Sequence, residues 1–581
     1  MNQNNKTMKR IKNILELSAK EAMTYFMKAS HYSTFELPEY FDFQPVLDFA
    51  MQKVGESKIE ECECGDPCKL SDVNLDILLN KDGKYAIRPL SLTNPYLYYF
   101  LVRDICSEGS WKRIKDCFSK YAIEQITACA IPVIPEDKES FHSSTTILNW
   151  WNSLEQRSVE LSLEYRYMFV SDITNCYGSI NPQTLLTALS MKGTKYECNG
   201  NNDLGAQIVK YLRALQNGKN IGIPQGSEIF NLIAEIILGY SDLLLAEEIE
   251  RSGINSDYRI LRYRDDYRIF CNDKDDLEEI SYLLQRVLLQ LNFQINSKKT
   301  MVSDSIITDS IKQDKQFYIF NTPIFKRRRV FKTVKDKEGQ EKVEVTYENE
   351  CDFNGLQKHL LFILMFGRKY PNSGQVRTQL NEFDARITKL LEQKVLAKGA
   401  FLWDEVDLDD YDSSLFKKDD KKEETEGNLF SNLKTYKFSP IKESVRPMVA
   451  IATQIAQENI TAAHYALRVI SRLVDTLDDS DPEKKDIVEK VCEKLRKQHN
   501  TTYLEIWLQN MTYSADKIKD DSHYTQGLCK LVMGENVELW NNSWLHANLT
   551  SGFPYSSICN ESKLNDVSPV IKIKSRWQYD A

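Results

Sequence analysis

Three acidic residues in this sequence are suited to metal-dependent chemistry. Asp172 ends the run MFVSD, and Asp265 and Asp266 lie inside RYRDDYRIF. Nucleotidyl transfer uses two divalent ions about 3.5–4 Å apart, and Mg²⁺ prefers carboxylate oxygens together with waters and phosphates. Two adjacent acids alone are usually a solvated turn, but apolar and aromatic residues flank this pair on both sides. We therefore predict that Asp172, Asp265 and Asp266 form a catalytic set for Mg²⁺, with Mn²⁺ as an alternative ion.

Short strands must hold these acids in place. MFVSDI from Met168 and RYRDDYRIF from Arg262 are rich in β-branched and aromatic residues and are bounded by polar turns, which predicts strands. A tight turn at Asp265–Asp266 would bring both carboxylates near Asp172. A long helix is expected from Glu228, with apolar positions at Phe230, Ile233, Ile236, Ile237 and Tyr240.

Several short motifs occur around these acids in a fixed order. KDGKYAIRPLSL precedes DITNCYGSI, and GIPQGSEIFNLIAE, YRDD and LNFQINSKKT follow. This series resembles the fingers and palm of reverse transcriptases over roughly residues 75–325. The matching positions are Asp172 and Tyr177 in motif A, Pro224, Gln225, Gly226 and Ser227 in motif B, Tyr263 to Asp266 in motif C, and Lys298 and Lys299 in motif D.

The resemblance implies a role for each nucleotide-binding position. Lys81 and Arg88 would neutralise the triphosphate, and the Gln225–Gly226 turn would face the nucleotide at a helix start. Tyr177 would act as a steric gate against the ribose 2′-OH, which implies a DNA product, and Lys299 is a candidate general acid. Ile173, next to Asp172, belongs to the implied metal and nucleotide sets. Each position also has a purely structural alternative. Arg88 would be a surface arginine and the Gln225–Gly226 turn a plain loop before a helix. Tyr177 would be a core aromatic, and Lys299 part of a solvated lysine pair.

Basic residues near the palm are candidates for nucleic-acid contact. Arg264 departs from the family, which more often has a small or apolar residue before the paired acids; it could bind primer or template phosphate, or pair with an acid. A basic run follows the palm, and its alternative is a solvated face; its members are Lys326, Arg327, Arg328 and Arg329.

The fold class indicated is α+β: a right-hand polymerase with an antiparallel palm sheet, followed by a C-terminal helical, HEAT-like domain. We expect an N-terminal and fingers region at 1–145, a palm at 146–325, a hairpin and thumb-like helices at 326–403, an acidic linker at 404–430 and a helical domain at 431–581. Helix-length patterns occur at 445–457, 460–477, 482–498 and 501–513.

Composition sets outer limits on function. The 581 residues carry a net charge of −9, so any nucleic-acid channel must be separate from the acidic excess. The 13 cysteines show no regular framework, and Cys62, Cys64 and Cys68 offer three ligands where zinc needs four. The first residues are unlike a secretory signal, and no apolar run is long enough for a membrane span. We expect a cytoplasmic protein with mostly free thiols and no membrane partner.

A variant palm joined to a long helical region resembles the bacterial abortive-infection and defence-associated reverse transcriptases. That resemblance implies dNTPs as substrates, an RNA partner (for some members a dedicated non-coding template), a DNA product, and a homo-oligomer in the bacterial cytoplasm. Synthesis in this group is templated, or untemplated from a protein tyrosine; Tyr579 is a candidate primer. The competing functions are an RNA-dependent RNA polymerase and a non-catalytic nucleic-acid-binding scaffold.

Overall fold

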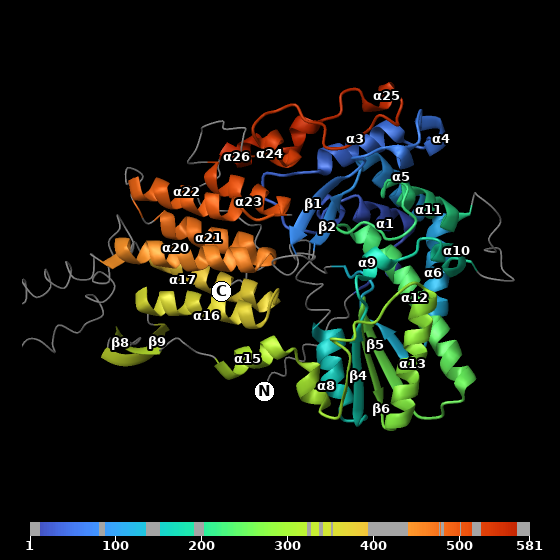
Figure 1. Ribbon diagram of the computed structural model, residues 1–581, viewed down its shortest axis with the longest axis horizontal. Coiled ribbons are helices and arrows are strands. Elements are labelled where there is room, and N and C mark those ends of the chain that lie inside the picture. The colour runs from blue at the N-terminus through green and yellow to red at the C-terminus, as the bar shows by residue number, and fades with distance from the viewer. Residues whose placement is uncertain are drawn as a thin grey trace, which may run out of the picture.

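The computed structural model describes residues 12–80, 87–134, 151–190, 203–321, 327–335, 341–349, 353–392, 440–475, 477, 482–499, 501–513 and 524–565. A strand-bearing lobe, an N-terminal helical lobe and a layer of later helices make up the chain (Figure 1). The linker expected at 404–430 and the candidate primer Tyr579 lie outside these residues.

A five-stranded sheet forms the palm. Its order is β3-β5-β6-β4-β7, with β3 at Ile126–Ala128, β4 at Tyr167–Asp172, β5 at Tyr258–Tyr263, β6 at Asp266–Cys271 and β7 at Met301–Ser303. The strands from β5 to β7 pair antiparallel, as predicted. The edge strand β3 runs parallel to β5, so the predicted antiparallel sheet carries one parallel strand at its edge. More than a hundred residues separate these two strands, and a connection of that length can return the chain in either direction.

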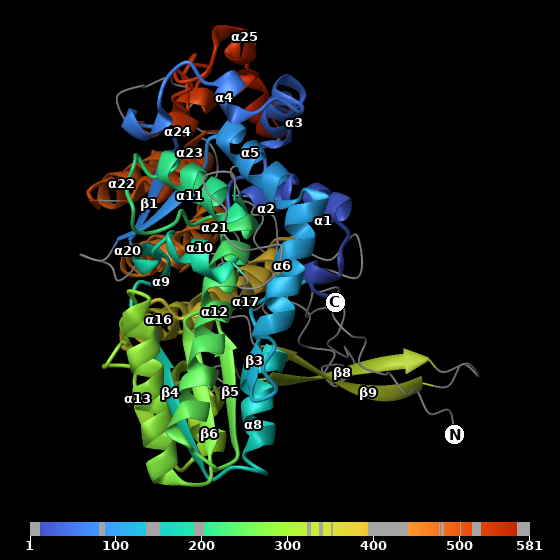
Figure 2. The same cartoon turned by 90° about the vertical axis from the view of Figure 1, so that its right-hand side faces the viewer.

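Alternating residues of β4 enter two different cores. Phe169 faces the large core, whereas Met168 belongs to a small cluster with Leu161, Phe270 and Ile306. This period of two is the pattern expected of a strand covered on both faces. The long helices α12 (Glu228–Ser252) and α13 (Lys274–Gln290) lie along one side of the sheet, and α8 (Arg157–Leu161) lies on the other (Figure 2).

Helix α12 is fixed to the sheet by a buried ion network. Arg262 of β5 has no exposed side-chain surface, and its Nη1 lies 3.0 Å from Glu235 Oε2 while its Nε lies 2.8 Å from Asp242 Oδ2. Two carboxylates share one guanidinium, and burial raises the pKa of Asp242 to about 6. Within the described ranges α12 is also the one helix long and apolar enough to cross a membrane, but 72% of its apolar window is buried inside the protein.

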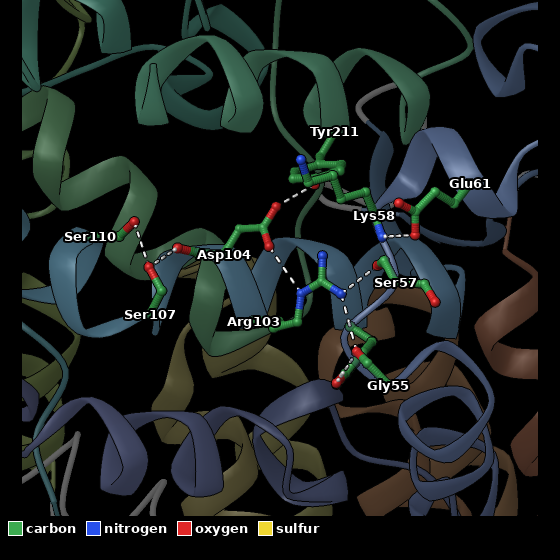
Figure 3. A network of polar contacts seen from close by, with 10 residues as sticks. Gly55, Ser57, Lys58, Glu61, Arg103, Asp104, Ser107, Ser110 and Tyr211 are labelled. Carbon is green, nitrogen blue, oxygen red and sulfur yellow. Dashed lines mark hydrogen bonds and ion pairs between the residues drawn. The ribbon is translucent and has the colours of Figure 1, made fainter. Parts of the chain in front are cut away.

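The N-terminal lobe carries the two-stranded sheet of β1 (Leu75–Asn80) and β2 (Ile87–Leu92). Beside it, α5 (Pro95–Ile105) is an almost wholly buried helix, capped by Asn94. Its end is tied to its neighbours by a polar network (Figure 3): Arg103 Nη1 donates to the carbonyl oxygens of Gly55 and Ser57 at 3.1 and 2.7 Å. Asp104 accepts from the Tyr211 hydroxyl of α11 (Leu204–Ala214), so α5 is bound both to α11 and to the segment of Gly55 and Ser57.

The later helices stack into one layer. They are α16 (Phe353–Lys369), α17 (Gly374–Glu392), α20 (Pro440–Glu458), α21 (Ala463–Val474), α22 (Pro482–Arg496) and α23 (Thr502–Thr512). The last four agree with the helix-length patterns of the sequence. Because α16 packs on α20 and α17 on α21, the expected thumb-like and C-terminal helices form a continuous body (Figure 1). A HEAT-like repeat stays a prediction. The hairpin of β8 (Arg327–Lys335) and β9 (Glu341–Asn349) is present as predicted.

The C-terminal segment returns to the N-terminal lobe. Trp540 Nε1 donates to the carbonyl oxygen of Leu92 at 2.9 Å, and the Tyr96 hydroxyl donates to that of Leu549 at 2.7 Å. Figure 1 shows this red segment lying beside the blue helices α3 (Gln44–Val54) and α5. Residues more than 440 positions apart therefore share one core.

Candidate active site

The three predicted acids meet at one edge of the palm sheet. Asp172, the last residue of β4, lies directly opposite Asp266, the first residue of β6. Strands β5 and β6 are joined by Arg264 and Asp265 alone, and the N–H of Ile173 donates to the Asp265 carbonyl at 3.0 Å. The turn lies one residue earlier than predicted, because Arg264 adopts a φ of +54°, a backbone conformation typical of two-residue hairpin loops.

Negative charge is concentrated at this edge. Burial, with the neighbouring carboxylates, raises the pKa of Asp265 and raises that of Asp266 to about 6. The Asp172 side chain is 8% exposed, and its Oδ2 is ion-paired with Lys299 Nζ. Its Oδ1 is buried and has no hydrogen-bond partner among the described residues. An unpartnered, buried carboxylate oxygen beside two further acids is an environment that favours a bound cation.

The three carboxylates suit hard divalent ions whose remaining coordination positions are filled by other ligands. In the parts of the chain that the structure describes, neither the three acids nor Cys62, Cys64 and Cys68 form a ready-made cage of three or more metal-binding side chains. The eleven described cysteines are free thiols. Mg²⁺ usually takes one or two carboxylates and fills its octahedron with water and substrate phosphates. Ile173 could add only backbone atoms, since its apolar side chain is buried.

A cleft of about 1730 Å³ opens in front of the acids. Its lining includes Asp172 and Asp265 from the palm, Arg88 from β2 and the Gln225–Gly226 turn. Among the described lining residues, eight acidic side chains face four basic ones. A polyanionic nucleotide would enter such a cleft only with accompanying cations, which agrees with the metal-binding character of the edge.

Arg88 lies on strand β2 of the fingers and lines the cleft. Burial lowers the pKa of its guanidinium, while the nearby Asp265 carboxylate raises it and Arg264 lowers it further. Arg88 and Asp265 line the same cleft. Lys81, its expected partner, lies outside the described residues.

The Gln225–Gly226 turn is held by the fingers and by the N-terminal segment. The Ser91 N–H donates to the Gln225 carbonyl and the Thr34 N–H to the Gly226 carbonyl, both at 2.8 Å. Gly226 has a φ of +130°, and an added Cβ would lie 3.1 Å from both the Phe35 ring and the Ser91 carbonyl oxygen. Only glycine suits this position, because both the backbone conformation and the space exclude a side chain.

Tyr177 lines the cleft next to motif B. Its hydroxyl donates to Asn231 Oδ1 of α12 at 2.6 Å, and burial raises the pKa of the phenol, so it stays neutral. Asn231 also lines the cleft and was not identified from the sequence. The available signal was its helical position, four residues after Ser227, on the turn of α12 that follows motif B.

The basic candidates lie in two places. Arg264 lines the cleft, with its guanidinium carbon 6.0 Å from the Tyr263 ring centroid, and its buried Nε has no hydrogen-bond partner among the described residues. Arg327, Arg328 and Arg329 lie on strand β8, in a hairpin that extends away from the palm sheet (Figure 2). Lys326 lies outside the described residues. The structure therefore brings Arg264 to the acids, but not the basic run.

Comparison with known proteins finds a family model that matches the part of the chain containing the three acids. Residues 110–343 match the family model described as reverse transcriptase (RNA-dependent DNA polymerase). The match contains all three acids, Tyr177 and the motif B turn, whereas Arg88 precedes it. No curated protein matches the chain.

Solved telomerase structures from two yeasts resemble parts of the chain. A truncated apo telomerase from Candida tropicalis is 14% identical over 40% of this chain and 49% of its own, with a TM-score of 0.25. The telomerase from Candida albicans with a fragment of telomeric RNA is 11% identical over 76% of this chain and 67% of its own, with a TM-score of 0.27. The chain thus spans about half the length of the first of these structures.

Proposed function

Because residues 110–343 form a reverse transcriptase domain, an RNA-directed DNA polymerase, we propose that this protein joins dNTPs to a growing DNA end with the help of two Mg²⁺ ions. One observation carries the proposal: Asp172 and Asp266 are cross-strand partners, next to Asp265, at the rim of a cleft that also holds Arg88, Tyr177 and the Gly226 turn. Each chemical requirement of nucleotidyl transfer has a matching side chain there.

In the proposed reaction, the primer 3′-hydroxyl gives its proton to solvent water and its oxygen forms a bond to the α-phosphorus of the dNTP. The bond from the α-phosphorus to the bridging oxygen breaks, and pyrophosphate leaves. Bound Mg²⁺ would lower the charge on the attacking and leaving oxygens. Asp172, Asp265 and Asp266 would hold the ions, and Arg88 would balance charge on the phosphates. Lys299 is positioned beside Asp172 to donate a proton to the departing pyrophosphate.

The direct test is synthesis by the purified protein. Labelled dNTPs or NTPs are supplied with Mg²⁺, with and without an RNA template carrying a DNA primer. We expect dNTP incorporation that is lost by at least about 1000-fold in Asp265→Asn and in Asp266→Asn, because removing one member of a metal-binding set disables the whole set. Arg446→Ala, which breaks two ion pairs at the surface between α20 and α22, is the matched control. A preference for NTPs would instead support the RNA polymerase alternative.

Retained biological effect in the Asp265→Asn protein would support the non-catalytic scaffold.

For the biological setting, we propose antiphage defence in the bacterial cytoplasm, with RNA-templated or template-independent synthesis, on the resemblance to the defence-associated group. Sequencing the nucleic acid that co-purifies distinguishes a defined cDNA from a homopolymer. In phage-challenged cells, protection that survives Asp265→Asn would contradict a role for synthesis in defence.

A further inference from the structure

Glu36 lies where the N-terminal lobe, the cleft and the helical layer meet. It lines the cleft, yet its side chain is only 9% exposed. One carboxylate oxygen accepts from the Tyr465 hydroxyl at 2.8 Å and the other contacts His464 Nε2, both residues of α21. The backbone carbonyl of Glu36 accepts from the Tyr503 hydroxyl of α23 at 2.9 Å. A single residue thus contacts two helices of the layer through three of its oxygens.

The residues of the helical layer that contact Glu36 are themselves tightly packed. The His464 ring stacks on Trp507, with centroids 4.8 Å apart and an interplanar angle of 18°, and Tyr503 meets the same His464 ring edge-on. His464 is 1% exposed and Trp507 is fully buried. The groups that hold Glu36 are therefore part of the packed interior of the helical layer, where side chains have little freedom to move.

The two residues before Glu36 in the chain contact the Gln225–Gly226 turn. Thr34 and Phe35 precede Glu36, and they are the residues that hydrogen-bond and pack against Gly226. The turn is also bound to β2 through Ser91 and Gln225, and β2 carries Arg88. A second link runs from the same layer to the partner strand of β2, since the Leu78 N–H donates to Thr502 Oγ1 at 3.0 Å.

We propose that Glu36 is a positioning residue through which helices α21 and α23 hold the Gln225–Gly226 turn in its nucleotide-binding conformation. The inference rests on the proposed polymerase function and extends it: the helical layer, far from the acids in sequence, is part of the dNTP-binding site. Loss of the Glu36 contacts should leave the acids in place and weaken dNTP binding, so the KM for dNTP rises more than kcat falls.

Two measurements test this on the full-length protein. The first is the KM for dNTP, which we expect to rise at least about fivefold in Glu36→Ala, the lower end of a coupling between sites. The second is amide hydrogen exchange without nucleotide. The Thr34 and Ser91 amides, which donate to the turn, should exchange about tenfold faster in Glu36→Ala. The conservative Glu36→Gln variant keeps an acceptor for Tyr465 and should recover most of both properties.

Tyr503→Phe removes only the hydroxyl that binds the Glu36 carbonyl and serves if Glu36→Ala fails to fold. Arg446→Ala, on the outer side of the same layer, should change neither measurement. Unchanged exchange at Thr34 and Ser91 would overturn the proposal, and so would faster exchange with an unchanged KM. If the wild-type protein makes no DNA, the polymerase function fails, and the exchange result alone decides whether Glu36 positions the turn.

Discussion

Lys299 is ion-paired with Asp172 at the edge of the palm sheet. Its ammonium group therefore contacts a carboxylate oxygen that a divalent cation would also bind. The Lys299 side chain is 64% exposed, whereas that of Asp172 is 8% exposed. The lysine can therefore swing away into solvent, while the acid stays fixed in its strand. Such a pair can exchange one cation for another without moving the backbone.

Lys299→Met should separate metal binding from proton transfer. Without the competing ammonium, Mg²⁺ should raise the melting temperature at a lower concentration than in the wild type, in the absence of nucleotide. DNA synthesis should still fall by about 10²-fold, since the proposed proton donor to pyrophosphate is lost. The exposed neighbour Lys298 provides the control, and Lys298→Met should resemble the wild type in both assays. A higher Mg²⁺ requirement in Lys299→Met would contradict competition at Asp172.

Tyr177→Ala should weaken discrimination against ribonucleotides. If the ring excludes the 2′-OH, its removal should raise kcat/KM for NTPs relative to dNTPs by about 10–100-fold. Tyr177→Phe keeps the ring but loses the 2.6 Å hydrogen bond to Asn231, so selectivity should persist with a modest loss of rate. Equal selectivity in the Ala and Phe variants would show that the ring is not the gate.

Gly226→Ala should impair nucleotide binding without unfolding the protein. The new Cβ would lie 3.1 Å from the Phe35 ring and from the Ser91 carbonyl oxygen, on a backbone with a φ of +130°. Strain of about 1–3 kcal/mol at the turn should appear as a higher KM for dNTP. Gly374→Ala, at the start of α17, meets nothing within 4 Å and is the matched control. A KM that stays at the wild-type value in Gly226→Ala would refute this account of the turn.

Asp242 should give the palm a measurable pH dependence of stability. Burial raises its pKa to about 6, against an ordinary value of 3.8, so the folded protein keeps a proton that the unfolded chain releases. This contribution is complete below pH 4 and is lost as the pH rises through 6. The free energy of unfolding of the wild type, minus that of Asp242→Asn, should therefore decrease by at most about 3 kcal/mol between pH 4 and pH 7.

These free energies of unfolding are measured by chemical denaturation at each pH. The exposed Asp486 is the control, because its pKa is shifted in the opposite direction. Hydrogen bonds from Lys490 and Arg446 lower the pKa of its carboxyl group. The corresponding difference for Asp486→Asn should therefore be small and should increase, not decrease, as the pH rises from 3 to 5. A flat profile for Asp242→Asn would mean that the buried carboxyl does not titrate in this range.

Local sequence was sufficient to predict the elements that carry the acids. The short β-branched and aromatic runs at Met168 and around Asp265, bounded by polar turns, predict strands. The gap between the patterns at 445–457 and 460–477 matches the end of α20 at Glu458. The turn was misplaced by one residue because an arginine at positive φ is uncommon and the RDD letters do not reveal it. The parallel edge strand β3 was missed because three residues, Ile126–Ala128, carry no period of their own.

Contacts between distant parts of the chain were beyond single-sequence reasoning. Glu36 and His464 are 428 positions apart, and each occurs in an ordinary local pattern. Asn231 and Tyr177 are 54 positions apart, and nothing in either motif names the other. Such pairings depend on how helices pack in three dimensions, and a single sequence contains no covariation to indicate them.

The return of the C-terminal segment to the N-terminal lobe has a consequence for biogenesis. Trp540 binds the carbonyl of Leu92, and Asn542 binds Asn94, at the start of α5. During translation, β2 and α5 lack these partners until about 450 further residues have left the ribosome. The nascent lobe should therefore need chaperone protection, and stalled or prematurely terminated chains should be strong substrates for proteolysis.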